Sequence, residues 1–231
     1  MSLKQIVPGL YRLSAGPVNV YVLEDAAGLV LIDTGFPGKT PHILKAIGGL
    51  KRSPSDVKHI VLTHAHFDHV GNLAALKQAT GAQTWMHAID APIAESGGPA
   101  RPMLPAREMP CGLIYRLFAK PDARVAPAKI DHRVQDGDLL PIASGLSAIH
   151  VPGHCAGQIA LFWETGNVIF AGDVCTNILG LGPPFGWEDE AQGRASQRKL
   201  AALSYDTACF GHGKPIVGGA SARMRRAFGD G

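Results

Sequence analysis

The sequence has no hydrophobic run long enough to cross a membrane and no segment typical of a secretion signal. Its apolar stretches all fall short of the roughly 18 consecutive residues that a membrane span requires. The start of the chain, residues 1–9, has no apolar core followed by a cleavage site. We therefore expect a cytoplasmic protein with no membrane partner, the alternative being a mature form from which a signal has already been removed.

Excess charge is also small, because 22 Lys and Arg residues against 19 Asp and Glu residues leave a net charge of +3. A dedicated nucleic-acid surface needs clustered Lys and Arg. The one dense cluster is Arg223, Arg225 and Arg226, next to Met224 and Phe228, and it fits the outer face of a final amphipathic helix. The sequence therefore argues against a nucleic-acid partner and favours a small molecule.

Cysteine is scarce and widely spaced. The four cysteines are Cys111, Cys155, Cys175 and Cys209, and they form no C-x-x-C pair. This spacing does not indicate a disulfide framework, so we expect reduced thiols in a reducing compartment.

Metal-capable side chains, in contrast, are concentrated in residues 64–69, which read H-A-H-F-D-H behind the apolar run at 60–62. In an extended segment, residues two apart point the same way, so His64 and His66 can bind one ion from one side. On a helix the same spacing would place them on nearly opposite faces. Asp68 and His69 follow where a helix is expected to begin, so they can turn toward a second ion.

Three further candidate ligands, His154, Asp173 and His212, each follow a strand-like apolar run and a glycine. A strand ends at such a point, and the backbone can bend to direct the side chain into a shared cleft. Each one singly could be a structural residue. Their repetition behind the H-x-H-x-D-H run favours a common metal site.

The apolar pattern predicts strands that alternate with helices over a chain of 231 residues, long enough for a sizeable core. We expect strands at residues 10–14, 18–23, 29–32, 60–62, 83–86, 146–151, 158–163, 168–171 and 207–210. Helices are expected at residues 39–50, after 69, from about 87–90, and at 188–203. Residues 28–33 and 166–173 echo each other as hairpin arms that end in aspartate. This alternation favours an α/β fold, an αββα sandwich of two mixed sheets with helices outside, as one domain over residues 1–231.

Residues 97–127 interrupt this pattern. The segment is rich in Pro, Ala, Arg and Met and lies between two candidate ligands, His69 and His154. Long irregular loops in compact domains are usually functional or disordered. We interpret the segment as a lid or pocket wall, with a simple surface excursion as the alternative.

The H-x-H-x-D-H run, the three single-ligand motifs in this order and the early Asp33-Thr34-Gly35 element resemble the metallo-β-lactamase superfamily of metal-dependent hydrolases, over residues 18–217. The resemblance implies the αββα fold, with the site at one edge of the sandwich where the halves meet. It also implies two sets of ligands joined by Asp173 as a bridge: His64, His66 and His154 for one ion, and Asp68, His69 and His212 for the other.

The implied cofactors are two divalent ions. Zn²⁺ is the first choice for imidazole and carboxylate ligands, and Fe or Mn would also fit. A metal-bridging hydroxide would attack an ester, lactone, thioester or amide carbonyl. Asp68 would orient this nucleophile and pass its proton to the leaving group, while Asp33 and Thr63 would support ligand imidazoles. Because Asp68 and Asp173 fill the acidic positions, we expect Cys155 and Cys175 to be packed thiols.

The motif set is closest to the lactonase and glyoxalase II-like branches of the family. Only 19 residues follow His212, which argues against the glutathione-binding helical extension of glyoxalase II. Thr176 and Asn177 stand where many lactonases carry a tyrosine, and an aspartate at position 173 counts against β-lactamase as the main activity, leaving it as a side reaction. An iron-dependent redox enzyme of the dioxygenase kind and a non-catalytic binding module are the alternative functions.

Large apolar residues flank the motifs and suggest a substrate with an apolar or acyl part. The candidate pocket residues are Phe36, Phe67, Asn177, Phe185 and Trp187. Aromatic residues at such positions can equally belong to the core.

Overall fold

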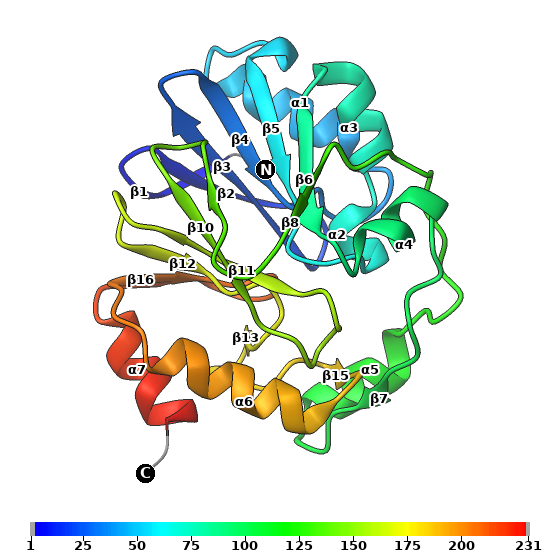
Figure 1. The fold of residues 1–231 in the computed structure, drawn as a ribbon, viewed down its shortest axis with the longest axis vertical. Coiled ribbons are helices and arrows are strands. Elements are labelled where there is room, and N and C mark those ends of the chain that lie inside the picture. The colour runs from blue at the N-terminus through cyan, green and yellow to red at the C-terminus, as the bar shows by residue number, and fades with distance from the viewer. Residues whose placement is uncertain (1–2, 230–231) are drawn as a thin grey trace.

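The computed structural model describes residues 3–229, and it builds them around two β-sheets that pack face to face (Figure 1). The first sheet has seven strands in the order β1-β2-β3-β4-β5-β6-β8. They are β1 (Lys4–Val7), β2 (Leu10–Ser14), β3 (Asn19–Asp25), β4 (Gly28–Ile32), β5 (Val57–Val61), β6 (Gln83–His87) and β8 (His132–Val134).

The second sheet has six strands in the order β17-β16-β12-β11-β10-β9. They are β9 (Leu139–Leu140), β10 (Leu146–His150), β11 (Ile159–Trp163), β12 (Val168–Phe170), β16 (Thr207–Cys209) and β17 (Ile216–Val217). Two short pairs complete the strands: β13 (Thr176–Asn177) with β14 (Leu181–Gly182), and β7 (Leu104–Pro105) with β15 (Gly186–Trp187).

Side chains that alternate between the two faces of each strand form three hydrophobic cores. One lies between the two sheets, and one lies between each sheet and its helices. On β3, Tyr21 and Leu23 pack between the two sheets, whereas Val20 and Val22 pack under the helices of the first layer. Successive side chains of a strand point to opposite faces, so a continuously apolar strand can be buried on both sides. Both sheets have their two faces covered in this way.

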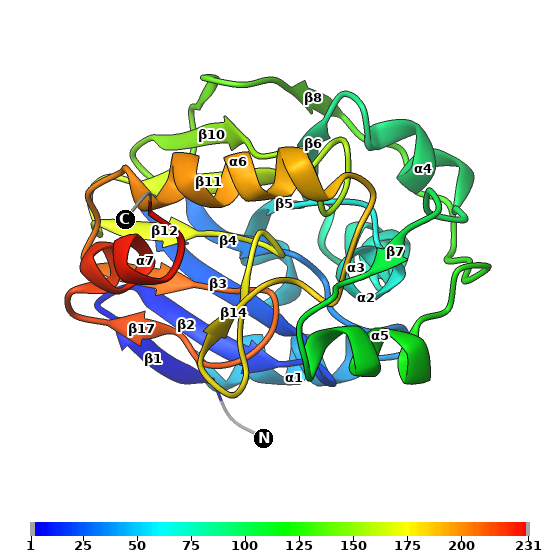
Figure 2. The same ribbon diagram turned by 90° about the horizontal axis from the view of Figure 1, so that it is seen from below.

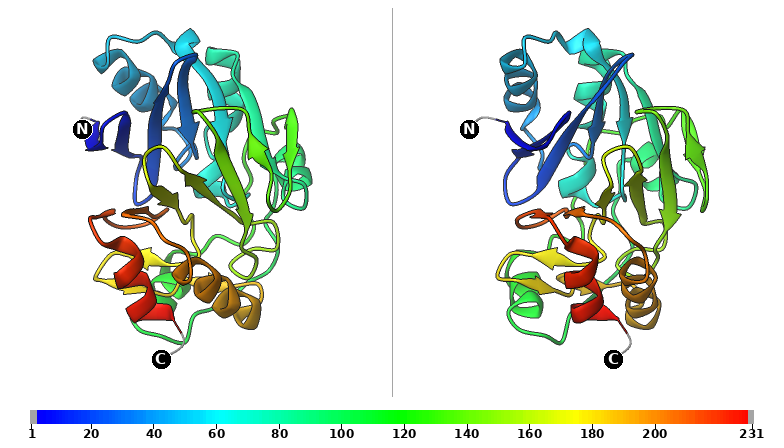
Figure 3. Two further views of the ribbon diagram at one scale, coloured as in Figure 1. Left: turned by 60° about the vertical axis from the view of Figure 1, so that its left-hand side comes forward. Right: turned by 90° about the vertical axis from the view of Figure 1, so that its left-hand side faces the viewer.

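Helices cover the outer face of each sheet, and those over the second sheet are in the foreground of Figure 2. The first layer contains α1 (Thr40–Gly49) and α3 (Leu73–Thr80), and the second contains α6 (Glu190–Ala201) and α7 (Ala220–Phe228). The remaining helices are short: η1 (Pro54–Asp56), α2 (Phe67–Val70), α4 (Ala91–Ser96) and α5 (Cys111–Phe118). The predicted αββα sandwich of two mixed sheets is therefore confirmed. In Figure 3 the N-terminal strands and the C-terminal helix α7 lie in different layers.

Each sheet contains an equivalent parallel pair beside a hairpin. Strand β4 runs parallel to β5, and β12 runs parallel to β16. Just beyond the first pair, the amide of Asp33 donates to the carbonyl of Val61 at 2.9 Å. Beyond the second, the amide of Ala171 donates to the carbonyl of Cys209 at 2.8 Å. Ligands of α/β proteins bind beyond the carboxyl ends of parallel strands, and the candidate metal ligands follow these ends.

The structure adds elements that the apolar pattern did not predict. Strands β1, β8, β9 and β17 are short edge strands. Strands β1 and β9 pair with the strand that follows each of them in the chain, whereas β8 pairs with β6 and β17 with β16. Residues 97–127, interpreted as irregular, contain β7 and α5, because β7 pairs with the distant β15. Within residues 3–229, no helix combines the length and the apolar character of a membrane span.

Candidate metal centre

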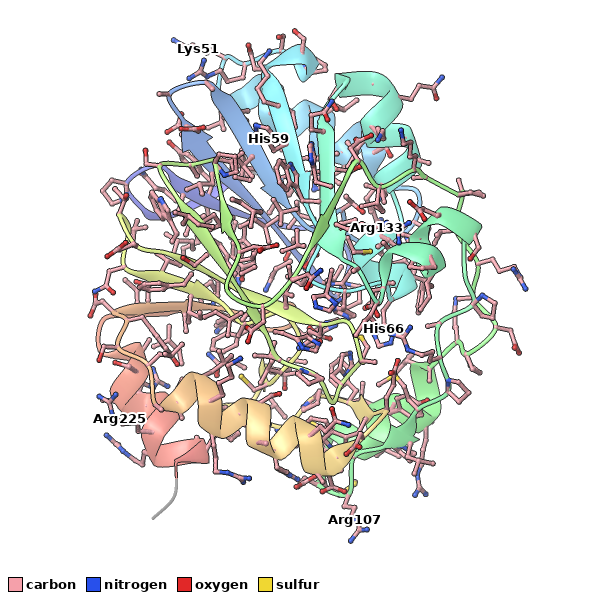
Figure 4. The ribbon with its side chains drawn as sticks, viewed as in Figure 1. Lys51, His59, His66, Arg107, Arg133 and Arg225 are labelled. Atoms are coloured by element: carbon pink, nitrogen blue, oxygen red, sulfur yellow. The ribbon has the colours of Figure 1, made fainter. Side chains whose placement is uncertain are left out.

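The ends of three strands, the short helix α2 and one loop bring the seven predicted ligand residues together. His64 follows β5, and His66 immediately precedes the short helix α2, which carries Asp68 and His69. From the second sheet, Asp173 follows β12, His212 follows β16, and His154 lies in the loop after β10. In Figure 4, His66 lies between the layers, on the side where residues 97–127 pass.

The carboxylate of Asp173 occupies the middle of this cluster. Its Oδ2 atom is 3.1 Å from Nε2 of His212 and 3.6 Å from Nε2 of both His69 and His154. Asp68 approaches from the exposed side, with its Oδ2 3.3 Å from Nε2 of His212. One carboxylate thus reaches imidazoles contributed by both sheets.

Among residues 3–229, three groups of side chains have donor atoms close enough to hold a metal ion. They are His64, His66, His154 and Cys155; His64, His69 and Asp173; and Asp68, His69 and His212, with the donor atoms of each group within 4.8 Å of one another. All four cysteines are buried and free, as expected. Burial, followed by the carboxylates of Asp90 and Glu188, raises the pKa of Cys155 well above its ordinary value, which favours the neutral thiol.

Outer partners fix the rings of four histidines. Nδ1 of His69 lies 2.9 Å from Asp33, and Nδ1 of His64 lies 3.0 Å from the hydroxyl of Thr63. Thr63 also donates its amide to Asp33 at 2.8 Å. These contacts leave Nε2 of each ring facing the cluster, which is how second-shell groups orient metal-binding imidazoles.

Backbone carbonyls serve the other two rings. Nδ1 of His154 is 2.8 Å from the carbonyl of Gly186, and Nδ1 of His212 is 3.0 Å from that of Pro17. Sequence reasoning missed both partners, because a carbonyl is present at every residue and gives no sequence signal.

His66 is oriented differently. Its Nδ1 lies 3.0 Å from Nε2 of His154 and so faces the cluster, while its Nε2 is buried without a hydrogen-bond partner. Nε2 of His64, Nε2 of His69 and Oδ1 of Asp173 are also buried and unpartnered. Buried polar atoms are normally satisfied, so the unpaired Nε2 atoms of His64 and His69, which face the cluster, fit a bound cation.

The charges divide the cluster into two parts. Burial lowers the pKa of His64 well below its ordinary value and that of His66 to about 3, and it also lowers the pKa of His154. These rings are therefore neutral, the form that binds metals. For His212, burial is outweighed by the carboxylates of Asp173 and Asp68, which raise its pKa to about 10. The acidic part of the cluster thus attracts positive charge.

Close approach at the centre requires glycine at position 211. A Cβ atom there would lie 2.0 Å from Oδ1 of Asp173 and 2.7 Å from Cε1 of His69. The glycine that precedes His212 therefore makes room for the central carboxylate, in addition to ending the strand.

The predicted pocket residues divide into two groups. Phe36 and Phe67 are half-buried and meet edge to face at 5.2 Å, and the ring of Phe185 lies 4.8 Å from that of His212. Trp187 is only 2% exposed and packs beneath the segment 97–127, and Asn177 donates to the carbonyl of Lys214. Of the five, Phe185 contacts a proposed ligand directly, Phe36 and Phe67 form an aromatic pair at the start of α2, and Trp187 and Asn177 lie in supporting positions.

Comparison with known proteins agrees with this geometry. Residues 13–212 match the family model of the metallo-beta-lactamase superfamily. Probable metallo-hydrolase YflN of Bacillus subtilis is 27% identical over 91% of this chain and 86% of its own length. A hydroxyacylglutathione hydrolase of Cereibacter sphaeroides is 30% identical over 84% of this chain and 65% of its own length. Among solved structures, BJP-1, a subclass B3 metallo-beta-lactamase of Bradyrhizobium japonicum, has a TM-score of 0.68 at 27% identity and covers 91% of this chain and 77% of its own.

Proposed function

Since the chain belongs to the metallo-β-lactamase superfamily, we propose that it is a dinuclear metal-dependent hydrolase of a small molecule, acting best on carboxylic esters or lactones. Thioesters and amides are chemically related substrates of the same proposed class. The observation that carries the proposal is the position of Asp173, whose Oδ2 lies within 3.6 Å of histidines from both proposed ligand sets.

In this proposal, His64, His66 and His154 would hold one ion, Asp68, His69 and His212 would hold the other, and Asp173 would contribute to both. Four-coordinate zinc with nitrogen ligands at about 2.0–2.1 Å places those ligand atoms about 3.3 Å apart. The distances from Asp173 and between His66 and His154, 3.0–3.6 Å, agree with that value. His66 would bind through Nδ1 and the other histidines through Nε2.

Zinc is the metal that we propose first, because imidazole and carboxylate ligands suit it, with iron and manganese as the other choices. Two bound divalent ions would supply a hydroxide at neutral pH and polarise the carbonyl of the substrate. Asp68, whose side chain is partly exposed, would orient the attacking oxygen and carry its proton to the leaving group. Asp33 and Thr63 would hold the rings of His69 and His64 in place.

The proposed substrate class depends on the residues that surround the metal centre. Phe36 and Phe67 form an apolar edge, and Nζ of Lys120, from the 97–127 segment, lies 5.8 Å above the ring of Phe36. An acyl group would pack against these rings, with the 97–127 segment as a wall or lid. The similarity to a hydroxyacylglutathione hydrolase makes a thioester the second substrate to test.

The test is a hydrolysis panel with zinc-loaded protein: lactones, aryl esters, thioesters, β-lactams and phosphodiesters. We expect carboxylic esters or lactones to be cleaved best, phosphodiesters poorly, and activity to be lost on chelation and restored by zinc. Metal analysis should give two equivalents per chain. Less than half an equivalent, with no gain on reconstitution, would refute the proposal. The predicted cytoplasmic location stays a prediction, which fractionation of the source cells would test.

A further inference from the structure

A partly buried ion-pair network outside the seven proposed ligands joins three separate segments. It consists of Asp90 after β6, Arg101 in the 97–127 segment and Glu188 after β15. Nη2 of Arg101 donates to Oδ1 of Asp90, and its Nε donates to Oε2 of Glu188 at 3.0 Å. The Asp90 side chain is completely buried, and that of Arg101 is 32% exposed. Because ionised groups are costly to bury unpaired, these three side chains depend on one another.

Asp90 binds the backbone next to the proposed histidine ligands. Its Oδ2 accepts from the amide of Ala65, the residue between His64 and His66, at 3.0 Å. Its Oδ1 accepts from the amide of Gly157, three residues after His154, at 3.0 Å. A Cβ at position 157 would lie 2.4 Å from that oxygen, so glycine permits the contact.

Glu188 binds the same loop from the other side. Its Oε2 accepts from the amide of Ala156 at 2.8 Å, and its own amide donates to the carbonyl of Gly153 at 2.9 Å. These two residues flank His154, whose ring is held by the carbonyl of Gly186, two residues before Glu188. The two carboxylates thus fix the backbone around three histidines.

Arg101 supplies the positive charge that both carboxylates share. A guanidinium presents donors in a fixed planar fork, so one arginine can bridge two acids in a way that lysine cannot reproduce. Its backbone belongs to the 97–127 segment, so this contact also attaches the segment to the ligand loops.

We propose that Arg101 is a positioning residue, which clamps the 97–127 segment to the three-histidine side of the centre and fixes His64, His66 and His154 for metal binding. This inference rests on the proposed dinuclear site. The inference gives the 97–127 segment a second role beside that of a pocket wall. Arg101 belongs to this segment and also determines the geometry of one metal position.

The experiment uses Arg101→Met, Arg101→Lys and the matched control Arg107→Met. Arg107 lies in the same segment, its side chain is 87% exposed, and it projects away from the molecule (Figure 4). Zinc is titrated against a chromophoric chelator in two backgrounds, His212→Ala to isolate the three-histidine position and His154→Ala to isolate the other. Arg101→Met is expected to raise the Kd about 10- to 100-fold in the first background, as loss of outer-shell partners typically does, and to change it less than about twofold in the second. Arg101→Lys should fall between, and Arg107→Met should match the parent in both.

Hydrogen exchange on metal-free protein gives an independent readout. The amides of Ala65, Ala156 and Gly157 should exchange at least about tenfold faster in Arg101→Met, and at the parent rate in Arg107→Met. Unchanged exchange together with unchanged zinc affinity would overturn the clamp. If Arg101→Met does not fold, Arg101→Lys decides, and parent values in that variant would overturn it too. A parent protein that binds no zinc would instead overturn the proposed function, a result that the metal-free exchange rates distinguish from failure of the clamp.

Discussion

The ligands of the proposed centre differ in how many ions each one serves, and single substitutions should expose the difference. Asp173→Ala is expected to weaken both ions, because its Oδ2 reaches His69 and His212 on one side and His154 on the other. His154→Ala should mainly empty the three-histidine position, and His212→Ala the other. Metal analysis after dialysis at graded zinc concentrations measures this pattern. Equal, undiminished metal content in all three variants would rule the assignment out.

Gly211 offers a test that leaves every ligand in place. In Gly211→Ala the new Cβ would lie 2.0 Å from Oδ1 of Asp173, so the carboxylate must move out of the centre. We expect metal content to fall from two equivalents to one or less, with activity lower by about tenfold or more. The matched control is Gly48→Ala in α1, where a Cβ meets nothing within 4 Å and alanine should stabilise the helix by about 0.5–1 kcal/mol. Normal metal content in Gly211→Ala would show that the carboxylate does not need this space.

At the residue scale, sequence reasoning identified side chains better than it identified their orientations. Spacing by two in an extended segment predicted that His64 and His66 face the same way, and both rings do lie in the cluster. The pattern could not reveal that Nδ1 of His66 faces inward, because that depends on its partner His154, 88 positions away. The role of Arg101 could not be predicted for the same reason, because its partners Asp90 and Glu188 lie 11 and 87 positions away in the sequence.

At the scale of elements, the strand β8 depends on one carboxylate just before it. Asp131 accepts from the amide of Thr84 at 3.0 Å and from its hydroxyl at 2.9 Å, and it also pairs with Lys77 of α3. Asp131→Asn should lower the free energy of unfolding by about 1–3 kcal/mol, the usual cost of breaking such contacts. Urea unfolding of metal-free protein at pH 7 measures it.

The same contact predicts a dependence on pH. Although burial opposes it, hydrogen bonds from Lys77 and Thr84 lower the pKa of Asp131. A carboxyl with a lowered folded-state pKa contributes stability above its unfolded pKa of about 3.9 and loses it as pH falls through the folded value. The difference in free energy of unfolding between the parent and Asp131→Asn should therefore have its full value at pH 7 and be smaller near pH 3. A difference that grows on acidification would contradict the assignment.

The segment 97–127 should set substrate choice through its outer part. Replacing residues 107–121, which include α5 but not Arg101, by a short Gly–Ser linker is expected to raise KM severalfold for long-chain acyl esters, because the wall over Phe36 is lost. An acetyl ester serves as the control substrate and should be little affected. Metal content should stay at two equivalents. Loss of metal in this variant would show that the outer part, rather than Arg101, supports the centre.

Elements with a strong local pattern were predicted well, and those that depend on distant pairing were not. Strand β2 matches the predicted residues 10–14, and α1 lies within the predicted 39–50, because alternation and helical spacing are local signals. Strand β7 has two residues and exists through its pairing with β15, some eighty residues later. Proline and alanine composition predicted an irregular segment there, and tertiary contacts supplied the order.

At the scale of the whole molecule, the centre is expected to contribute to stability because its ligands come from both layers. His64 follows a strand of the first sheet, and Asp173 and His212 follow strands of the second. At a free zinc concentration of 100 times Kd, each ion would stabilise the folded state by about 2.7 kcal/mol. For a domain of this size that corresponds to a fall in Tm of about 5–10 °C per ion on chelation. Calorimetry with and without a chelator measures it, and an unchanged Tm would contradict metal binding between the layers.

The overall fold could be predicted from the order of the motifs along the chain more than from any single helix or strand. The predicted sandwich is confirmed, and the cluster lies where the two halves meet, because both parallel strand pairs end at that edge. The outermost strands of the two sheets, β1, β8, β9 and β17, were not predicted, and this did not affect the result because they lie at the edges of the sheets.

The equivalent parallel pairs have one consequence for how far each aspartate reaches. When the matching backbone bonds are aligned, Asp33 in the first half corresponds to Ala171 in the second, so Asp173 stands two positions farther along its chain. Two residues of polypeptide span at most about 7 Å. The earlier aspartate stops beside the outer nitrogen of His69, whereas the later one extends to the shared middle of the cluster. The number of residues after the strand thus determines how far each carboxylate extends into the cluster. Asp33 orients a histidine from outside, and Asp173, two positions farther along, lies among the proposed ligands.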